Sequence, residues 1–151
     1  MADLLGQVLP PRRAMVGAAQ AAYPSRWELA VDRVIADRYK IVEPIGTGGS
    51  SQVFLAHDQK LGRQVALKVL DERATAQDDL RKMFVKEGRA LAQLSHPNVV
   101  AVHDVGEVDG RPYLVMEYVD GISLKQRIER AGALALADVV RLGGEIAAGL
   151  E

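Results

Sequence analysis

The sequence contains no cysteine in its 151 residues. This absence excludes disulfides, thiolate nucleophiles and cysteine-ligated zinc sites. The chain also lacks an excess of either charge, because its formal net charge is −1. There is therefore no electrostatic reason to expect nucleic acid or an anionic membrane surface as a partner. The three histidines, His57, His96 and His103, lack the spacing of metal ligands, and we predict no metal site.

Long apolar runs are absent as well. No stretch approaches the roughly 18 apolar residues of a membrane-spanning helix. The N-terminal segment has no continuous apolar core of the kind found in signal peptides, because Gly6-Gln7 and Pro10-Pro11 interrupt it. We predict a cytoplasmic protein without membrane contacts. With 48% hydrophobic and 26% charged residues, the composition is that of one globular domain with an apolar core.

The chain divides into four segments. Residues 1–24 are rich in alanine and glycine and predict a flexible extension. Ser25 and Glu28 have the spacing of a capping box, which predicts a short helix over 25–36. The main domain follows over 37–119. Residues 120–151 begin with a connector and continue as two helices, one capped by Ser123 and ending at Gly132, the other starting near Asp138.

Within the main domain, short apolar runs bounded by turn residues predict strands. The predicted strands cover residues 39–45, 52–57, 63–70, 99–102 and 113–116. A glycine-dense turn, residues 46–51, separates the first two strands, and a hairpin loop at 107–111 separates the last two. Between the third and fourth strands, apolar residues at helical spacing over 77–94 predict one long helix.

The glycine turn and Lys68 on the third strand together indicate a phosphate site. A loop without side chains lets backbone N–H groups approach phosphate oxygens, because no Cβ blocks the approach. A lysine on a neighbouring strand supplies a compensating positive charge. Strand evidence alone equally allows a structural lysine, with its stem buried at a strand edge and its ammonium group in water.

Glu87 lies in the middle of the apolar stripe of the long helix. The stripe consists of Leu80, Met83, Phe84, Leu91 and Leu94. A carboxylate facing a core is unfavourable unless it meets a cation, so Lys68 and Glu87 are each other's obvious partners. A glutamate at a hydrated rim of the stripe is the alternative.

These motifs, in this order, resemble the N-terminal lobe of the eukaryotic-like Ser/Thr protein kinases of bacteria. The matching segments are Gly46-x-Gly48-x-x-Ser51-x-Val53, Val65-Ala66-Leu67-Lys68, Glu87, His96-Pro97-Asn98-Val99-Val100 and Val115-Met116-Glu117-Tyr118-Val119-Asp120-Gly121. The resemblance implies an α+β fold, with a five-stranded antiparallel sheet, one long helix and the first helices of the C-terminal lobe. The remaining alternative is a β-rich domain without a nucleotide site, which would require Lys68 and Glu87 to be unrelated.

The resemblance also implies a role for each site residue. Lys68 would hold the α- and β-phosphates of ATP while paired with Glu87. The backbone of Gly46, Thr47, Gly48, Gly49, Ser50 and Ser51 would cover the phosphates. The apolar roof over adenine would be Ile45, Val53 and Ala66, with Met116 as gatekeeper, Glu117 and Val119 bonding the adenine edge and Asp120 near the ribose. Ser51 departs from the pattern, because it replaces the third glycine of the loop.

Three kinase motifs do not occur in the 151 residues: H-R-D-x-x-x-x-N, D-F-G and A-P-E. They supply the aspartate that positions the nucleophile, the Mg²⁺ ligands and the activation segment. We therefore expect a truncated kinase that binds ATP weakly, holds no Mg²⁺ ligands and has no transferase activity as a separate 151-residue polypeptide. The alternative is a non-catalytic module that engages another protein or kinase lobe through the apolar faces of the helices after Ser123.

Overall fold

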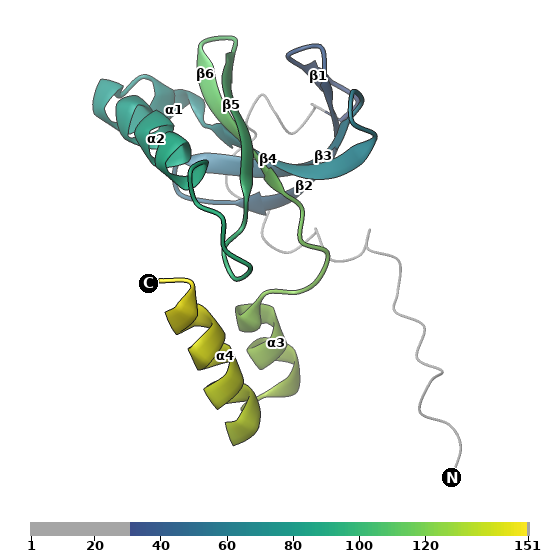
Figure 1. Cartoon of the computed structure of the whole chain (residues 1–151). Helices are drawn as coiled ribbons and strands as arrows, with labels where there is room; N and C mark the ends of the chain where they lie inside the picture. The colour runs from purple at the N-terminus through teal and green to yellow at the C-terminus, as the bar shows by residue number, and fades with distance from the viewer. Residues whose placement is uncertain (1–30, 151) are drawn as a thin grey trace. The chain divides into compact units, whose positions relative to one another are not determined.

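The computed structural model describes residues 31–150 (Figure 1). Six strands form one antiparallel sheet in the order β1-β2-β3-β4-β6-β5. The strands are β1 (Val34–Ile35), β2 (Tyr39–Thr47), β3 (Ser51–Asp58), β4 (Arg63–Leu70), β5 (Val102–Val108) and β6 (Arg111–Glu117). The helices are α1 (Glu72–Thr75), α2 (Asp78–Leu91), α3 (Leu124–Ala131) and α4 (Leu136–Ala148).

The first strand, β1, was not predicted. The predicted extension over 1–24 and most of the predicted helix over 25–36 lie outside the described residues. Residues 31–36 form a turn and β1 instead of the end of that helix, so the sheet has six strands rather than five. The physical reason is that Ile35 pairs with Tyr39 of β2 and both side chains are buried there. Burial against the sheet outweighs a helical spacing that is only local.

The other predicted strands are present, with shifted ends in the second half of the sheet. The strand predicted over 63–70 coincides with β4. The strand predicted over 99–102 begins only at Val102 and runs on to Val108. The hairpin loop is shorter than the predicted loop over 107–111, because only Asp109 and Gly110 connect β5 to β6. Their φ values are 49° and 75°. Positive φ at both central residues is the geometry of a two-residue type I′ turn.

The sheet is apolar on both faces. On one face α1 and α2 pack over a core cluster. The cluster consists of Leu70, Ala74, Phe84 and Leu114, with Leu80, Val105 and Met116 packed against it. Side chains alternate along each strand, so the intervening residues build a second core on the other face. That second core includes Ile41, Val65, Leu67 and Val115.

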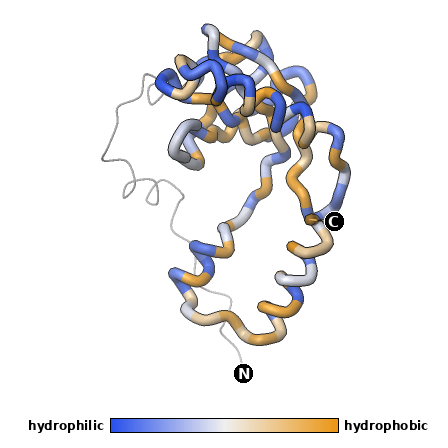
Figure 2. Tube along the Cα trace, turned by 90° about the vertical axis from the view of Figure 1, so that its left-hand side faces the viewer, coloured by the Kyte–Doolittle hydropathy of each residue, from blue (hydrophilic) through white to orange (hydrophobic). Residues whose placement is uncertain are grey.

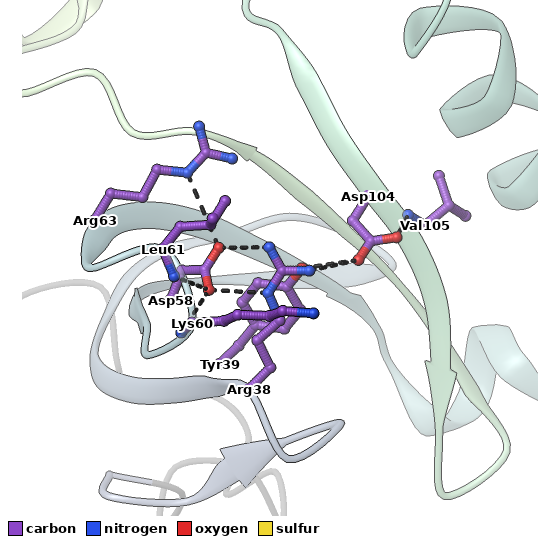
Figure 3. Close-up of polar contacts among 8 residues, drawn as sticks. All are labelled: Arg38, Tyr39, Asp58, Lys60, Leu61, Arg63, Asp104 and Val105. Carbon is purple, nitrogen blue, oxygen red and sulfur yellow. Dashed lines mark hydrogen bonds and ion pairs between the residues drawn. The ribbon is translucent and has the colours of Figure 1, made fainter.

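A polar cluster fastens the edge of the second core (Figure 3). The Asp58 carboxylate, which has no solvent exposure, accepts hydrogen bonds from Nε and Nη2 of Arg38 at 2.9 and 2.8 Å. It also accepts the backbone N–H groups of Lys60 and Leu61 at 3.1 and 3.2 Å. The Arg38 hydrogen bond is the main reason that the pKa of Asp58 falls to about 2. These contacts tie the start of β2 to the β3–β4 turn.

Helices α3 and α4 follow the sheet in the chain. The predicted capping box of α3 is confirmed: the Ser123 hydroxyl accepts the Gln126 N–H, and the Gln126 side chain accepts the Ser123 N–H. Gly132 ends α3 with φ of 75°. Along α4, Figure 2 shows many hydrophobic residues. Across residues 31–150, none of the helices combines the length and hydropathy that a bilayer crossing requires.

Candidate functional site

The register of the sheet brings five of the predicted site residues to the face that α2 covers. Val53 lies opposite Gly46 on one side and Lys68 on the other, and Ala66 lies opposite Met116. Directly opposed residues project to the same face of a sheet, as do residues two apart on one strand. Gly46, Val53, Ala66, Lys68 and Met116 therefore share one face.

The glycine-rich loop is a tight connection between β2 and β3. The Gly48 N–H donates a hydrogen bond to the Ser51 carbonyl at 2.8 Å, which closes the tip. The Asp71 N–H donates to the Ser50 carbonyl at 2.9 Å, so the loop is also held from the end of β4. Ser51 is the first residue of β3, is buried and pairs with Leu70. The serine that replaces the third glycine therefore belongs to the strand and not to the tip.

The three loop glycines are not required by the folding of the chain itself. None of them has a positive φ. A Cβ would lie 3.8 Å from the Val53 Cβ if built on Gly46, 3.6 Å from the Ser51 oxygen if built on Gly48, and would meet nothing within 4 Å on Gly49. These are ordinary contacts or open space. What a side chain here would obstruct is an external group approaching the backbone.

Lys68 and Glu87 do not form an ion pair in this structure. The Lys68 ammonium lies over the ring of Phe84, with Nζ 5.6 Å from the ring centroid. The Glu87 side chain is exposed, and within residues 31–150 it forms no salt bridge. The prediction that Glu87 faces the core is therefore wrong. The reason lies in the rotation of α2, whose buried residues are Phe84 and Gly88.

The predicted hinge residues lie at and beyond the end of β6. Met116 is half-buried, whereas Glu117, Val119 and Asp120 are exposed, as is Ile45 on β2. The Glu117 N–H donates to the Ala101 carbonyl at 2.9 Å, which fixes the last residue of β6 against the segment before β5.

A hollow of about 400 Å³ lies beside the hinge. Its lining residues are Pro97, Asn98, Val99, Val100, Glu117, Val119, Leu142, Glu145 and Ile146. It contains two predicted adenine-edge residues but neither the loop nor Lys68. On its wall the Asn98 side chain donates to the Glu145 carbonyl of α4 at 2.8 Å. The hollow thus adjoins the predicted adenine edge and is separate from the predicted phosphate site.

Comparison with known proteins identifies the family of this chain. The family model described as protein kinase domain matches residues 39–151, which is more than half of the chain. The chain belongs to the protein kinase family. Among curated relatives, it is 40% identical over 124 residues to the probable serine/threonine-protein kinase PknB of Lactococcus lactis, and 39% identical over 106 residues to the serine/threonine-protein kinase PrkC of Bacillus subtilis. These alignments cover 82% and 70% of this chain but 20% and 16% of the relatives.

The fold agrees with that of a kinase. The chain is similar to the crystal structure of the Mycobacterium tuberculosis PknI kinase domain, with a TM-score of 0.69 and 34% identity. The similarity covers 81% of this chain and 50% of the PknI chain. The predicted α+β class and kinase N-lobe architecture are therefore confirmed, with the additional strand β1. The chain spans about a fifth of PknB and half of the PknI kinase domain.

Sequence reasoning missed two residues next to the site, Phe84 as the neighbour of Lys68 and Gly88 as the contact point of α2. A search for a stripe of apolar side chains overlooks a glycine, because glycine has no side chain. One pattern could have found them: Leu80, Phe84 and Gly88 recur every four residues. A glycine on the buried side of a helix commonly has a packing reason.

Proposed function

We propose that this chain is the ATP-binding lobe of a Ser/Thr protein kinase, in which the loop 46–51 and Lys68 hold the nucleotide phosphates. One observation carries the proposal. The loop glycines have no positive φ and no steric need to be glycine, and they adjoin a lysine on the same sheet face. An anionic ligand that approaches the backbone accounts both for the glycines and for the lysine beside them. A lysine with a purely structural role accounts only for the lysine.

The surrounding residues fit the rest of the nucleotide. Val53 and Ala66 share the face of Lys68 and provide an apolar surface for a planar base. Met116 lies opposite Ala66 and would limit the depth of that surface. Ile45, Glu117, Val119 and Asp120 are exposed at its margin, where the adenine edge and ribose would lie.

The described residues offer no set of ligands for magnesium. Within residues 31–150 no three histidine, aspartate or glutamate side chains gather as metal ligands. We therefore assign no step to the metal.

Phosphoryl transfer from ATP to protein serine or threonine is the reaction that the family implies. A separate 151-residue polypeptide, without the H-R-D, D-F-G and A-P-E motifs, is expected to bind ATP weakly and not to transfer its phosphate.

The test is a calorimetric titration with ATP, ADP and adenosine. We expect ATP to bind more tightly than adenosine, because only the phosphates reach the loop and Lys68. Lys68→Met should weaken ATP binding about tenfold, the effect of losing one charge-assisted contact, and leave adenosine binding unchanged. Lys86→Met is the matched control, since Lys86 is an exposed lysine of α2. Equal losses in the two variants would contradict the assignment of Lys68.

A second function is favoured by the apolar surface of α4. Leu136 and Val140 of α4 are 78% and 67% exposed, and Leu150, just after the end of the helix, is 82% exposed. Exposed apolar patches of this kind mark protein interfaces. We propose as the alternative a non-catalytic module that binds another protein or kinase lobe through this helix. Concentration-dependent association in light scattering that Val140→Glu abolishes would support this alternative, and a monomer at every concentration would count against it.

A further inference from the structure

Asp71 connects the glycine-rich loop to the rest of the lobe. It lies between β4 and α1, and its backbone N–H donates to the Ser50 carbonyl at 2.9 Å. This hydrogen bond extends the β3–β4 ladder by one pair beyond Ser51 and Leu70. Hydrogen-bonded pairs alternate in an antiparallel ladder, so the preceding one lies two residues further from the loop tip, at Gln52. Asp71 therefore supplies the last ladder contact before the tip.

The other polar groups of Asp71 begin helix α1. Its carboxylate accepts the Ala74 N–H at 2.7 Å, and its carbonyl accepts the Thr75 N–H at 2.9 Å and the Thr75 hydroxyl at 2.6 Å. Ala74 is buried in the core cluster beneath α1 and α2. Glu72, the first residue of α1, accepts a hydrogen bond from Nη2 of Arg111 on β6 at 2.9 Å. Through Asp71, the loop is fastened to a helical turn that is itself fixed to the core and to β6.

This contact fixes the direction of one carbonyl of the glycine-rich loop. Ladder hydrogen bonds run from strand to strand, so the Ser50 carbonyl points along the sheet toward Asp71. A carbonyl oxygen carries a partial negative charge and repels phosphate oxygens. Released from Asp71, this carbonyl is free to turn toward the face that carries Lys68. A loop that is already ordered also loses less conformational freedom when a ligand binds.

We propose that Asp71 is a positioning residue for the glycine-rich loop. Its N–H directs the Ser50 carbonyl away from the phosphates, and its side chain caps the helical turn that keeps this N–H in place. The proposal deepens the proposed function and rests on it for the role of the loop in phosphate binding. The contact between Asp71 and Ser50 is a property of the free protein, so it is testable without nucleotide.

Asp71→Pro removes the N–H and leaves the local backbone conformation accessible. Asp71 has a φ of −71° and a ψ of 167°, which proline adopts readily. Leu70, the residue before it, is extended in β4, as a residue before proline prefers to be. Asp71→Ala is the matched variant, because both substitutions remove the carboxylate cap and only proline removes the N–H as well. The difference between these two variants isolates the Ser50 contact.

The heteronuclear ¹⁵N NOE of the free protein measures the order of the loop backbone. In the wild type we expect the value at Ser50 to be close to that of Val53 within β3. In Asp71→Pro the value at Ser50 should drop from the range of rigid backbone into that of flexible backbone, and it should be lower than in Asp71→Ala. Val53 serves as the internal control and should keep its value. An unchanged value at Ser50 in Asp71→Pro would overturn the proposal.

Calorimetric titration with ATP and adenosine tests the effect on binding. Asp71→Pro should bind ATP about fivefold more weakly than Asp71→Ala, the effect of one hydrogen bond, and should bind adenosine equally well. Asp71→Asn keeps the cap and removes one negative charge, so it should bind ATP at least as tightly as the wild type. Asp78→Ala is the charge control, since Asp78 lies in the exposed first turn of α2 and pairs only with the exposed Lys82 there. It should not weaken ATP binding.

Equal ATP affinities of Asp71→Pro and Asp71→Ala, or a parallel loss of adenosine binding, would contradict the positioning role. If Asp71→Pro does not fold, the comparison of Asp71→Ala with Asp71→Asn decides, because only asparagine keeps the cap. The proposal then requires weaker ATP binding and a lower NOE at Ser50 in the alanine variant, and equal values would overturn it. If the wild type itself does not bind ATP, the proposed function and the positioning role both fail, whereas the NOE alone decides whether Asp71 holds the loop.

Discussion

Replacing Asp58 by asparagine should remove a stabilisation that depends strongly on pH. The Asp58 carboxylate is fully buried and has a pKa of about 2, below its ordinary value of 3.8, mainly because of the hydrogen bond from Arg38. A folded-state pKa below the unfolded one stabilises the fold above pH 3.8, and this stabilisation is lost as the pH falls toward 2. Linkage gives a loss of about 1 kcal/mol by pH 3 and about 2 kcal/mol by pH 2.

The assay is urea denaturation followed by far-UV circular dichroism from pH 6 down to pH 2, on the wild type and on Asp58→Asn. Near neutral pH the variant should be less stable by about 2–4 kcal/mol, since it leaves Arg38 without its buried partner. The difference between the two proteins should shrink by about 2 kcal/mol on acidification, while effects of the other carboxylates cancel. A difference that stays constant between pH 6 and pH 2 would refute the reasoning.

Two further substitutions test the packing and the capping. Gly106→Ala should destabilise the chain by about 1–3 kcal/mol in urea denaturation, because a Cβ there would lie 2.4 Å from Oη of the buried Tyr113; wild-type stability would show that the tyrosine moves aside freely. Ser123→Ala should cost about 1 kcal/mol by removing the capping box of α3, with a matching loss of helical circular dichroism. A helical signal that does not change would argue against a role for this cap.

Local patterns predicted those elements whose causes are local. Strand β4 has an apolar run that only Lys68 interrupts, and a polar turn precedes it, so its ends could be placed correctly. The cap of α3 depends only on Ser123 and Gln126, three positions apart. Strand β1 has two residues and exists because Ile35 is buried against Tyr39, which no local preference reveals.

At the site, the sheet was easier to predict than the helix. Alternation along β4 placed Lys68 on one face with Ala66, and the register agrees. The direction of Glu87 could not be predicted from an apolar stripe, because the stripe takes no account of Gly88, which is buried together with Phe84 on the sheet side of α2. Asp58 has the sequence environment of an exposed turn residue. Its burial depends on Arg38, which is 20 positions earlier in the chain.

The central claim is that the loop 46–51 receives nucleotide phosphates. Backbone amide chemical shifts of the ¹⁵N-labelled chain, recorded during titration with ATP and separately with adenosine, test it most directly. We predict that ATP, but not adenosine, moves the amide resonances of Gly46, Gly48 and Gly49. Changes confined to the hinge and α4, or equal changes with both ligands, would contradict a phosphate site in this loop.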